Sequence, residues 1–167
     1  MTIVYGEIDL KLNRWVKYSL WGMLAVALTV IDQLSKMWMV NASGGVEGKG
    51  FIIIKNVLNF TYLKNYGASM GLFSGQRIAL ICVTVLVFAF GIYYFIKHRP
   101  ENTLFLAAVS LVASGAVGNL IDRVFLGYVR DFIDVQFINF YIFNFADCVI
   151  CIGAGLLMLY AFLNVRD

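Results

Sequence analysis

The chain has 167 residues, of which 61% are hydrophobic and 14% are charged, and its formal net charge is +3. Soluble globular domains carry about 25% charged residues, so this composition excludes a protein whose whole surface faces water. The positive charge is small and dispersed, which argues against a nucleic-acid-binding function. We therefore expect a single integral membrane domain over residues 1–167.

Four segments are long and apolar enough to cross about 30 Å of hydrocarbon as helices. They cover about residues 16–40, 77–97, 104–122 and 146–163. Lys11, Arg14 and Lys17 precede an apolar run from Tyr18 to about Val40, in the way that basic residues precede the apolar core of a secretory signal peptide. The apolar run that follows is longer than such a core of about 7–15 residues, so we expect it to remain as a membrane span.

Four spans place both ends of the chain on the same side of the membrane. The side that carries the termini has basic residues close to the span ends, at Arg14 and Lys17 and in the short connection at residues 97–99. The positive-inside rule then predicts that both termini are cytoplasmic. The segments at residues 41–76 and 123–145 are therefore expected on the outer side.

The two outer segments contain runs rich in β-branched and aromatic residues. These runs are residues 51–54, 57–63, 129–135 and 137–143, and their composition favours strands. We expect a small sheet that lies against the outer membrane surface. The predicted fold class is membrane all-α, with four transmembrane helices and a small outer-face β platform.

Half of the ten acidic residues are predicted at one depth, in the outer half of the membrane or just outside it: Asp32, Asp122, Asp131, Asp134 and Asp147. Charged groups inside or against a bilayer are costly to keep and usually functional. Asp131 and Asp134 point to opposite faces of a strand, so we expect only one of them to face a site.

Asp131 and Asp147 each have a structural interpretation beside the functional one. Asn144 and Asp147 have the spacing of a helix N-terminal cap, which would also fix Asp147 at the membrane surface. Asp131 could form a structural ion pair with Arg123. Two facing aspartates, however, share one proton, so that the ionised member can activate water while the protonated member binds a peptide carbonyl. This chemistry needs no metal or cofactor.

Other peptidase mechanisms fit the sequence poorly. Serine and cysteine peptidases need a histidine beside the nucleophile, and the one histidine, His98, is predicted on the opposite side of the membrane from the carboxylates. Cys148 has no base to activate it. We interpret Cys148 and Cys151 as packing residues, and the three cysteines predict neither a disulfide framework nor a zinc site.

Five blocks of sequence resemble the lipoprotein signal peptidase (signal peptidase II) family, in the same order, over about residues 16–163. The blocks are Asp32-Gln33-Leu34-Ser35-Lys36, Asn65-Tyr66-Gly67-Ala68-Ser69-Met70-Gly71, Gly115-Ala116-Val117-Gly118-Asn119-Leu120-Ile121-Asp122-Arg123, Val129-Arg130-Asp131-Phe132-Ile133-Asp134 and Phe143-Asn144-Phe145-Ala146-Asp147. Any single block is weak, but five in order are specific.

The resemblance implies a role for each matching position. It makes Asp131 and Asp147 the catalytic pair. It implies substrate-binding roles for Asn65, Gly67, Asn119, Arg123 and Asn144. It implies buried structural roles for Asp32, Lys36 and Asp122.

The resemblance also implies an activity, a substrate and a location. The expected enzyme is an aspartic endopeptidase of the bacterial cytoplasmic (inner) membrane, with its active site at the outer face. It removes the signal peptide from prolipoproteins by cleaving before a cysteine that carries diacylglycerol. We expect it to act as a monomer in contact with membrane lipid and without nucleic acid. The chain departs from the family at Arg130, where valine is common, at Cys148, where serine is common, and at Ser69-Met70, where alanine and an aromatic residue are usual. These departures bear on substrate fit and remove no catalytic group.

Two other functions are compatible with carboxylates in a membrane. A proton-coupled transporter or channel would keep them near the midplane, often between repeats, and a membrane chaperone would not need two aspartates around one water.

We also predict three contacts within the chain. Asp122 should contact Lys36, and Arg123 should reach Asp32, the backbone of the site or substrate carbonyls. Ser114 and Gly118 should allow close helix packing.

Overall fold

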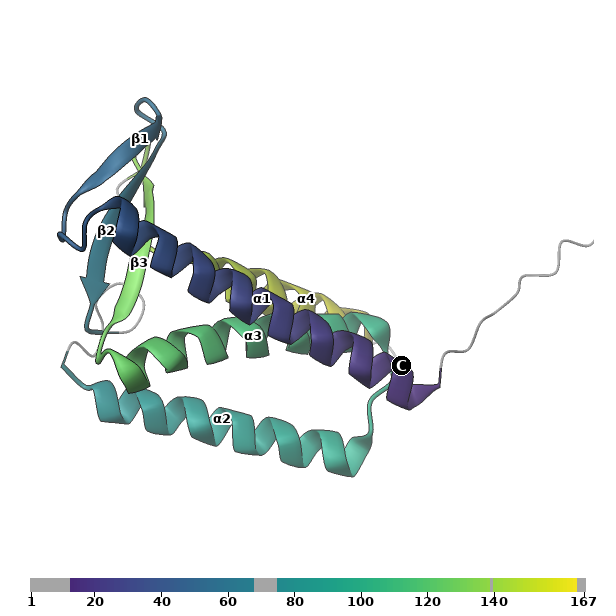
Figure 1. Cartoon of the computed structure of the whole chain (residues 1–167). Coiled ribbons are helices and arrows are strands. Elements are labelled where there is room, and N and C mark those ends of the chain that lie inside the picture. The colour runs from purple at the N-terminus through teal and green to yellow at the C-terminus, as the bar shows by residue number, and fades with distance from the viewer. Residues whose placement is uncertain (1–12, 68–74, 139, 165–167) are drawn as a thin grey trace, which may run out of the picture.

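A computed structural model of the protein describes residues 13–67, 75–138 and 140–164. Within these residues it contains helices α1 (Arg14–Ala42), α2 (Arg77–His98), α3 (Thr103–Phe125) and α4 (Phe145–Asn164), with strands β1 (Gly50–Ile54), β2 (Leu58–Asn65) and β3 (Val129–Val135), as Figure 1 shows. Each helix is long and apolar enough to cross a membrane. The four predicted spans are therefore confirmed.

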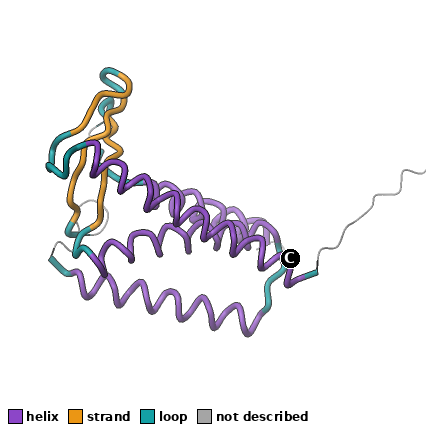
Figure 2. Tube along the Cα trace, in the orientation of Figure 1, coloured by secondary structure: helices purple, strands orange, loops and turns teal. Residues whose placement is uncertain are grey.

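The three strands gather at one end of the helical bundle, and both ends of the described chain lie at the other end (Figures 1 and 2). Helix α3 packs against α1 and α4, and α2 lies to one side and touches α3. An even number of spans predicts this grouping of the termini.

Local sequence signals explain where the helices begin and end. The Asn13 side chain accepts a hydrogen bond from the Trp15 N–H at 3.0 Å and caps α1, and Asn102 caps α3 by accepting from the Phe105 N–H at 3.1 Å. Helix α2 ends where Arg99 adopts a left-handed conformation with φ of 45°. Pro100 follows and cannot continue the helix.

Small residues on α3 allow both neighbouring helices to approach closely. A Cβ added to Gly118 would lie 2.4 Å from Oδ2 of Asp32 on α1, and a Cβ added to Gly115 would lie 2.3 Å from the carbonyl oxygen of Ala146 on α4. Ser114 is buried one helical turn before Gly118. The predicted close packing around Ser114 and Gly118 is therefore confirmed.

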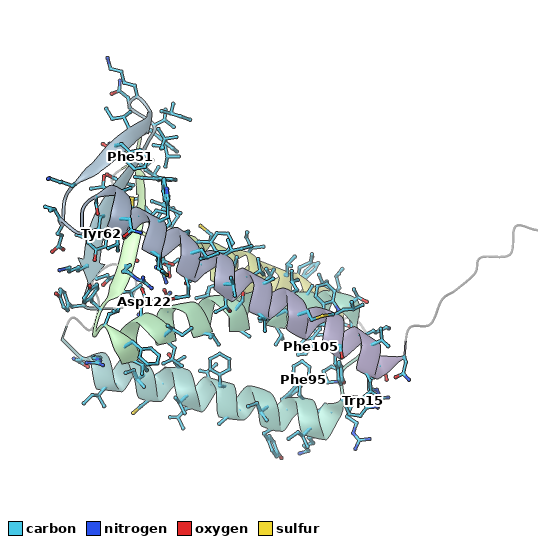
Figure 3. The ribbon with its side chains drawn as sticks, in the orientation of Figure 1. Trp15, Phe51, Tyr62, Phe95, Phe105 and Asp122 are labelled. Atoms are coloured by element: carbon cyan, nitrogen blue, oxygen red, sulfur yellow. The ribbon has the colours of Figure 1, made fainter. Side chains whose placement is uncertain are left out.

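The sheet is antiparallel in the order β1-β2-β3, and aromatic side chains join it to the end of α1. The Trp38 and Phe60 rings meet edge to face at 6.0 Å, and Phe60 meets Phe132 in the same way at 5.4 Å. Met39 and Tyr62 are buried beneath them. Figure 3 shows Tyr62 at this junction. The predicted β platform is thus present and fixed to the helices.

The prediction of a strand at residues 137–143 is wrong for the part of it that the structure describes, which excludes residue 139. A turn follows β3, and only Phe143 pairs with a strand, as an isolated bridge to Ile133. The segment must lead from the end of β3 into α4 at Phe145, so its few residues form a connection despite their aromatic content. Its side chains are exposed at Phe137 and Tyr141.

Candidate active site

A cavity of about 570 Å³ opens where β2, β3, α3, α4 and the segment before α4 meet. Most of the residues with predicted catalytic or substrate-binding roles contribute to its wall: Asn65, Gly67, Asn119, Arg123, Asp131 and Asp147. The remaining one, Asn144, is fully buried behind the wall. The fold therefore gathers side chains from four separate blocks of the sequence around one space.

Asp131 lies on β3 and is 1% exposed. Its two carboxylate oxygens accept hydrogen bonds from amide groups, one from Asn65 Nδ2 at 2.9 Å and one from Asn144 Nδ2 at 2.6 Å. Burial, and next the negative charge of Asp147, raise the pKa of Asp131 from 3.8 to about 7. Asp131 therefore holds a proton in the folded protein up to neutral pH.

Asp147 lies in the first turn of α4 and forms a reciprocal cap with Asn144. The Asn144 N–H donates to Oδ2 of Asp147 at 3.1 Å, and the Asp147 N–H donates to Oδ1 of Asn144 at 3.1 Å. The predicted cap is therefore confirmed, and it fixes the side chain that lines the cavity. The other oxygen of Asp147 accepts a hydrogen bond from Asn119 Nδ2 at 2.9 Å.

Two asparagine side chains connect the two carboxylates. Asn144 Nδ2 donates both to Asp131 and, at 3.2 Å, to Oδ1 of Asn119. Lys36 donates to the same Oδ1 at 2.9 Å, so the amide nitrogen of Asn119 must point the other way, toward Asp147. The result is a continuous hydrogen-bonded path from Asp131 through Asn144 and Asn119 to Asp147.

Arg123 lines the cavity from the last turn of α3. It donates to the carbonyl oxygen of Gly67 at 3.1 Å, which is the predicted contact with the backbone of the site. The ion pairs within the described residues do not include one between Arg123 and Asp131 or Asp32. The alternative interpretation of Asp131 as the partner of a structural ion pair with Arg123 is therefore wrong.

Asp134 lies on the same strand as Asp131 but does not line the cavity. It accepts a hydrogen bond from Thr61 Oγ1 at 3.0 Å instead. Cys148 and Cys151, by contrast, do contribute to the cavity wall as free thiols. The interpretation of the two cysteines as packing residues did not include a place in the cavity wall. Cys151 lies four residues after Asp147 and three after Cys148, a spacing that puts it on the helix face that these two residues share with the cavity.

Three charged side chains brace the cavity from behind. Lys36 Nζ lies 2.9 Å from Asp32 and 3.6 Å from Asp122, and all three are almost completely buried. The predicted contact between Asp122 and Lys36 is confirmed. Asp32 also accepts a hydrogen bond from the Ala146 N–H at 2.9 Å, which attaches the start of α4 to α1.

Sequence reasoning missed two members of this buried cluster. Arg130 Nη2 lies 2.6 Å from Asp122 Oδ1 and donates to Gln33 Oε1 at 2.8 Å. Gln33 follows Asp32 and Arg130 precedes Asp131 in the blocks that resemble the family. This proximity to the aspartates was the one sequence feature that could have indicated their role. The positions Ser69 and Met70 lie outside the described residues. In residues 13–67, 75–138 and 140–164 no group of three or more His, Cys, Asp or Glu is placed to hold a metal ion.

Comparison with known proteins gives one consistent result. The family model described as signal peptidase (SPase) II matches residues 24–163. A lipoprotein signal peptidase of Clostridium novyi is 40% identical over 134 residues, covering 78% of this chain and 89% of that protein. One of Clostridium acetobutylicum is 40% identical over 148 residues, covering 86% and 94%.

Solved structures agree with these relatives. A bacterial membrane enzyme structure obtained by the in meso method at 2.3 Å resolution matches with a TM-score of 0.81 and 34% identity, covering 88% of this chain and 90% of that one. A second, at 1.9 Å resolution, matches with a TM-score of 0.76 and 35% identity, covering 87% and 94%.

Proposed function

The chain belongs to the signal peptidase II family, and we propose that it is an aspartic endopeptidase that processes lipid-modified prolipoproteins. In this proposal it removes the signal peptide by cleaving the peptide bond directly before a cysteine that carries diacylglycerol. One observation carries the mechanism: Asp131 and Asp147 line the same cavity and are joined through Asn144 and Asn119.

The surroundings of the two carboxylates support different roles for them. Asp131 is buried with a pKa of about 7, so it can enter the reaction protonated. Asp147 accepts hydrogen bonds from Asn119 and from the Asn144 N–H at the start of α4, where the helix dipole favours a negative charge. We assign Asp131 as the acid that binds the scissile carbonyl and Asp147 as the base.

The proposed reaction is balanced between these two groups. Asp147 removes a proton from a water molecule as the water oxygen attacks the carbonyl carbon, and Asp131 gives its proton to the carbonyl oxygen. The neutral gem-diol then collapses as the C–N bond breaks. Asp147 gives its proton to the leaving amine, and a gem-diol hydroxyl returns a proton to Asp131. All of these groups come from one chain, which supports action as a monomer.

The remaining cavity residues support binding of a lipid-anchored peptide. Arg123 uses one N–H on the Gly67 carbonyl and carries further donors for substrate carbonyls. Asn65 holds Asp131 in place. Apolar side chains form another part of the wall, namely Leu63, Val129, Ile142 and Ile150. Because the cavity lies at the sheet end of the bundle, a lipid-anchored cysteine would hold its scissile bond at the required depth.

The direct test is cleavage of a diacylglyceryl-modified prolipoprotein, followed by the shift of the product on a gel. Wild type should cleave the modified substrate and not the unmodified one. Asp131→Asn and Asp147→Asn should each lower the cleavage rate by about 1,000-fold or more while the protein remains folded. Turnover near the wild-type rate by either folded variant would overturn the proposed pair.

We also propose that the termini are cytoplasmic and that the cavity faces outward. Basic residues at the end opposite the sheet support this orientation, among them Lys97 in the last turn of α2. In a chain without its native cysteines, Val46→Cys should react with an impermeant thiol reagent added to whole cells, and Glu101→Cys should not. The reverse pattern would place the cavity in the cytoplasm and contradict this orientation.

A further inference from the structure

Four charged side chains meet where α1, α3 and β3 come together; three are buried and the fourth, Arg130, is largely buried. Lys36 contacts Asp32 and Asp122, and Arg130 contacts Asp122, so two positive groups balance two negative ones. Figure 3 shows Asp122 at the sheet end of α3. The proposed reaction uses none of these four groups directly. Arg130 is the one of them that directly precedes a proposed catalytic residue in the chain.

Arg130 holds Asp122 with its backbone and its side chain together. Its N–H donates to Oδ2 of Asp122 at 2.9 Å, its Nε donates to the same oxygen at 3.1 Å, and its Nη2 donates to Oδ1 at 2.6 Å. The same Nη2 reaches Gln33 on α1 at 2.8 Å. The side chain is 11% exposed. These bonds fix the start of β3, and therefore Asp131, against two helices.

Arg130 also affects which groups Lys36 contacts. Lys36 has three donors, and one of them orients Asn119 toward Asp147. With Arg130 present, Asp122 already has a cationic partner. Without it, one ammonium would serve two buried carboxylates, and the 3.6 Å contact between Lys36 and Asp122 would shorten at the expense of the bond to Asn119.

We propose that Arg130 is a positioning residue for peptide cleavage, which holds Asp131 through β3 and holds Asp147 through Asp122, Lys36 and Asn119. This inference rests on the proposed function. It predicts that Arg130 affects the rate of the chemical step more than substrate binding, because Arg130 does not line the cavity. A small displacement of reacting groups lowers catalysis strongly, by up to about 100-fold per ångström.

The test compares kcat and KM for purified, folded variants on the lipid-modified substrate. Arg130→Met should lower kcat by about 10-fold to 100-fold and change KM by about twofold or less. Arg130→Lys should be faster than Arg130→Met, because lysine keeps the positive charge although it cannot form the bidentate contact with Asp122. Adding Asp122→Asn to Arg130→Met should also recover kcat, because it removes the carboxylate that would draw Lys36 away from Asn119. The double variant keeps the experiment decisive if Arg130→Met alone does not fold.

Arg77→Met is the matched control. Arg77 is an exposed arginine that donates to the Val124 carbonyl near the same end of α3 without a carboxylate partner among the ion pairs of the described residues. Its loss should leave kcat within about twofold of wild type. A wild-type kcat for folded Arg130→Met, or a double variant no faster than the single one, would overturn the inference. Cleavage by Asp131→Asn and Asp147→Asn would instead overturn the proposed function.

Discussion

Helices α2 and α3 have almost the same length and are both strongly apolar, yet they occupy different environments. Their most apolar windows have mean hydropathies of 2.5 and 2.0. Helix α2 has no buried residue, whereas the buried residues of α3 are Leu106, Ala108, Ser110, Ser114, Gly115, Gly118, Asn119 and Asp122. The less apolar helix is therefore the one inside the protein.

This difference follows from the physics of packing in lipid. Lipid tails are as apolar as leucine, so apolarity does not drive one helix against another. Small residues allow close approach, and polar side chains find partners only inside the protein. Helix α3 supplies both kinds and carries Asn119 and Arg123 into the cavity. On α2, by contrast, the Thr84 hydroxyl donates a hydrogen bond to the Leu80 carbonyl oxygen of the same helix.

The largest contrast between the two helices should come from glycine replacement. Gly118→Val on α3 forces a side chain against Asp32, so we expect a loss of about 3–5 kcal/mol in stability and little or no cleavage. Gly91→Val on α2 meets no atom within 4 Å at its Cβ and should behave like wild type. Thermal unfolding in detergent measures both. Equal stability of the two variants would remove the distinction between the helices.

We expect a pH-dependent contribution to stability at the polar end of the bundle, where Asp131 lies. The pKa of Asp131 is raised from 3.8 to about 7 in the folded protein, so folding takes up a proton between these values. The stability that Asp131 contributes is present below about pH 4 and lost as the pH rises through 7.

Asp131→Asn should therefore gain stability relative to wild type by up to about 4 kcal/mol as the pH rises from 4 to 8. The difference in melting temperature between the two proteins, measured across this range, checks the sign. A difference that does not change with pH would show that the buried carboxyl is not responsible.

A smaller effect, on the cleavage rate, is expected from replacing Asn119, whose side-chain amide on α3 binds Asp147. Asn119→Ala removes the hydrogen bond to Asp147 and the acceptor for Lys36, so kcat should fall by about 10-fold to 100-fold. Thr84→Ala on α2 is the control and should leave kcat unchanged. Full activity of Asn119→Ala would mean that Asp147 is held by its cap with Asn144 alone.

Much of the fold could be predicted because its signals are local. Hydropathy locates the four spans, and the spacing of Asn144 and Asp147 predicts the cap at the start of α4. The prediction of a strand at residues 137–143 was wrong because a β-prone composition does not show that the chain must change direction there to enter α4. The location of that turn depends on how β3 and α4 are placed in space.

The partners within the polar cluster were harder to predict. Asp122 and Lys36 could be paired because both lie at a similar depth on neighbouring spans. The contact of Arg130 with Asp122 and Gln33 needs the relative placement of β3, α3 and α1. The bond from the Ala146 N–H to Asp32 needs that of α4 and α1. No sequence pattern carries these placements.

The central claim is that Asp131 on β3 and Asp147 in the first turn of α4 act as one catalytic unit. The most direct test is the single-turnover cleavage rate of Asp131→Asn, Asp147→Asn and the double variant on one diacylglyceryl-modified substrate. Groups that act as a unit are not additive, so the double variant should be within about threefold of the slower single variant. If the two losses instead multiply, each aspartate acts independently and the shared mechanism is wrong.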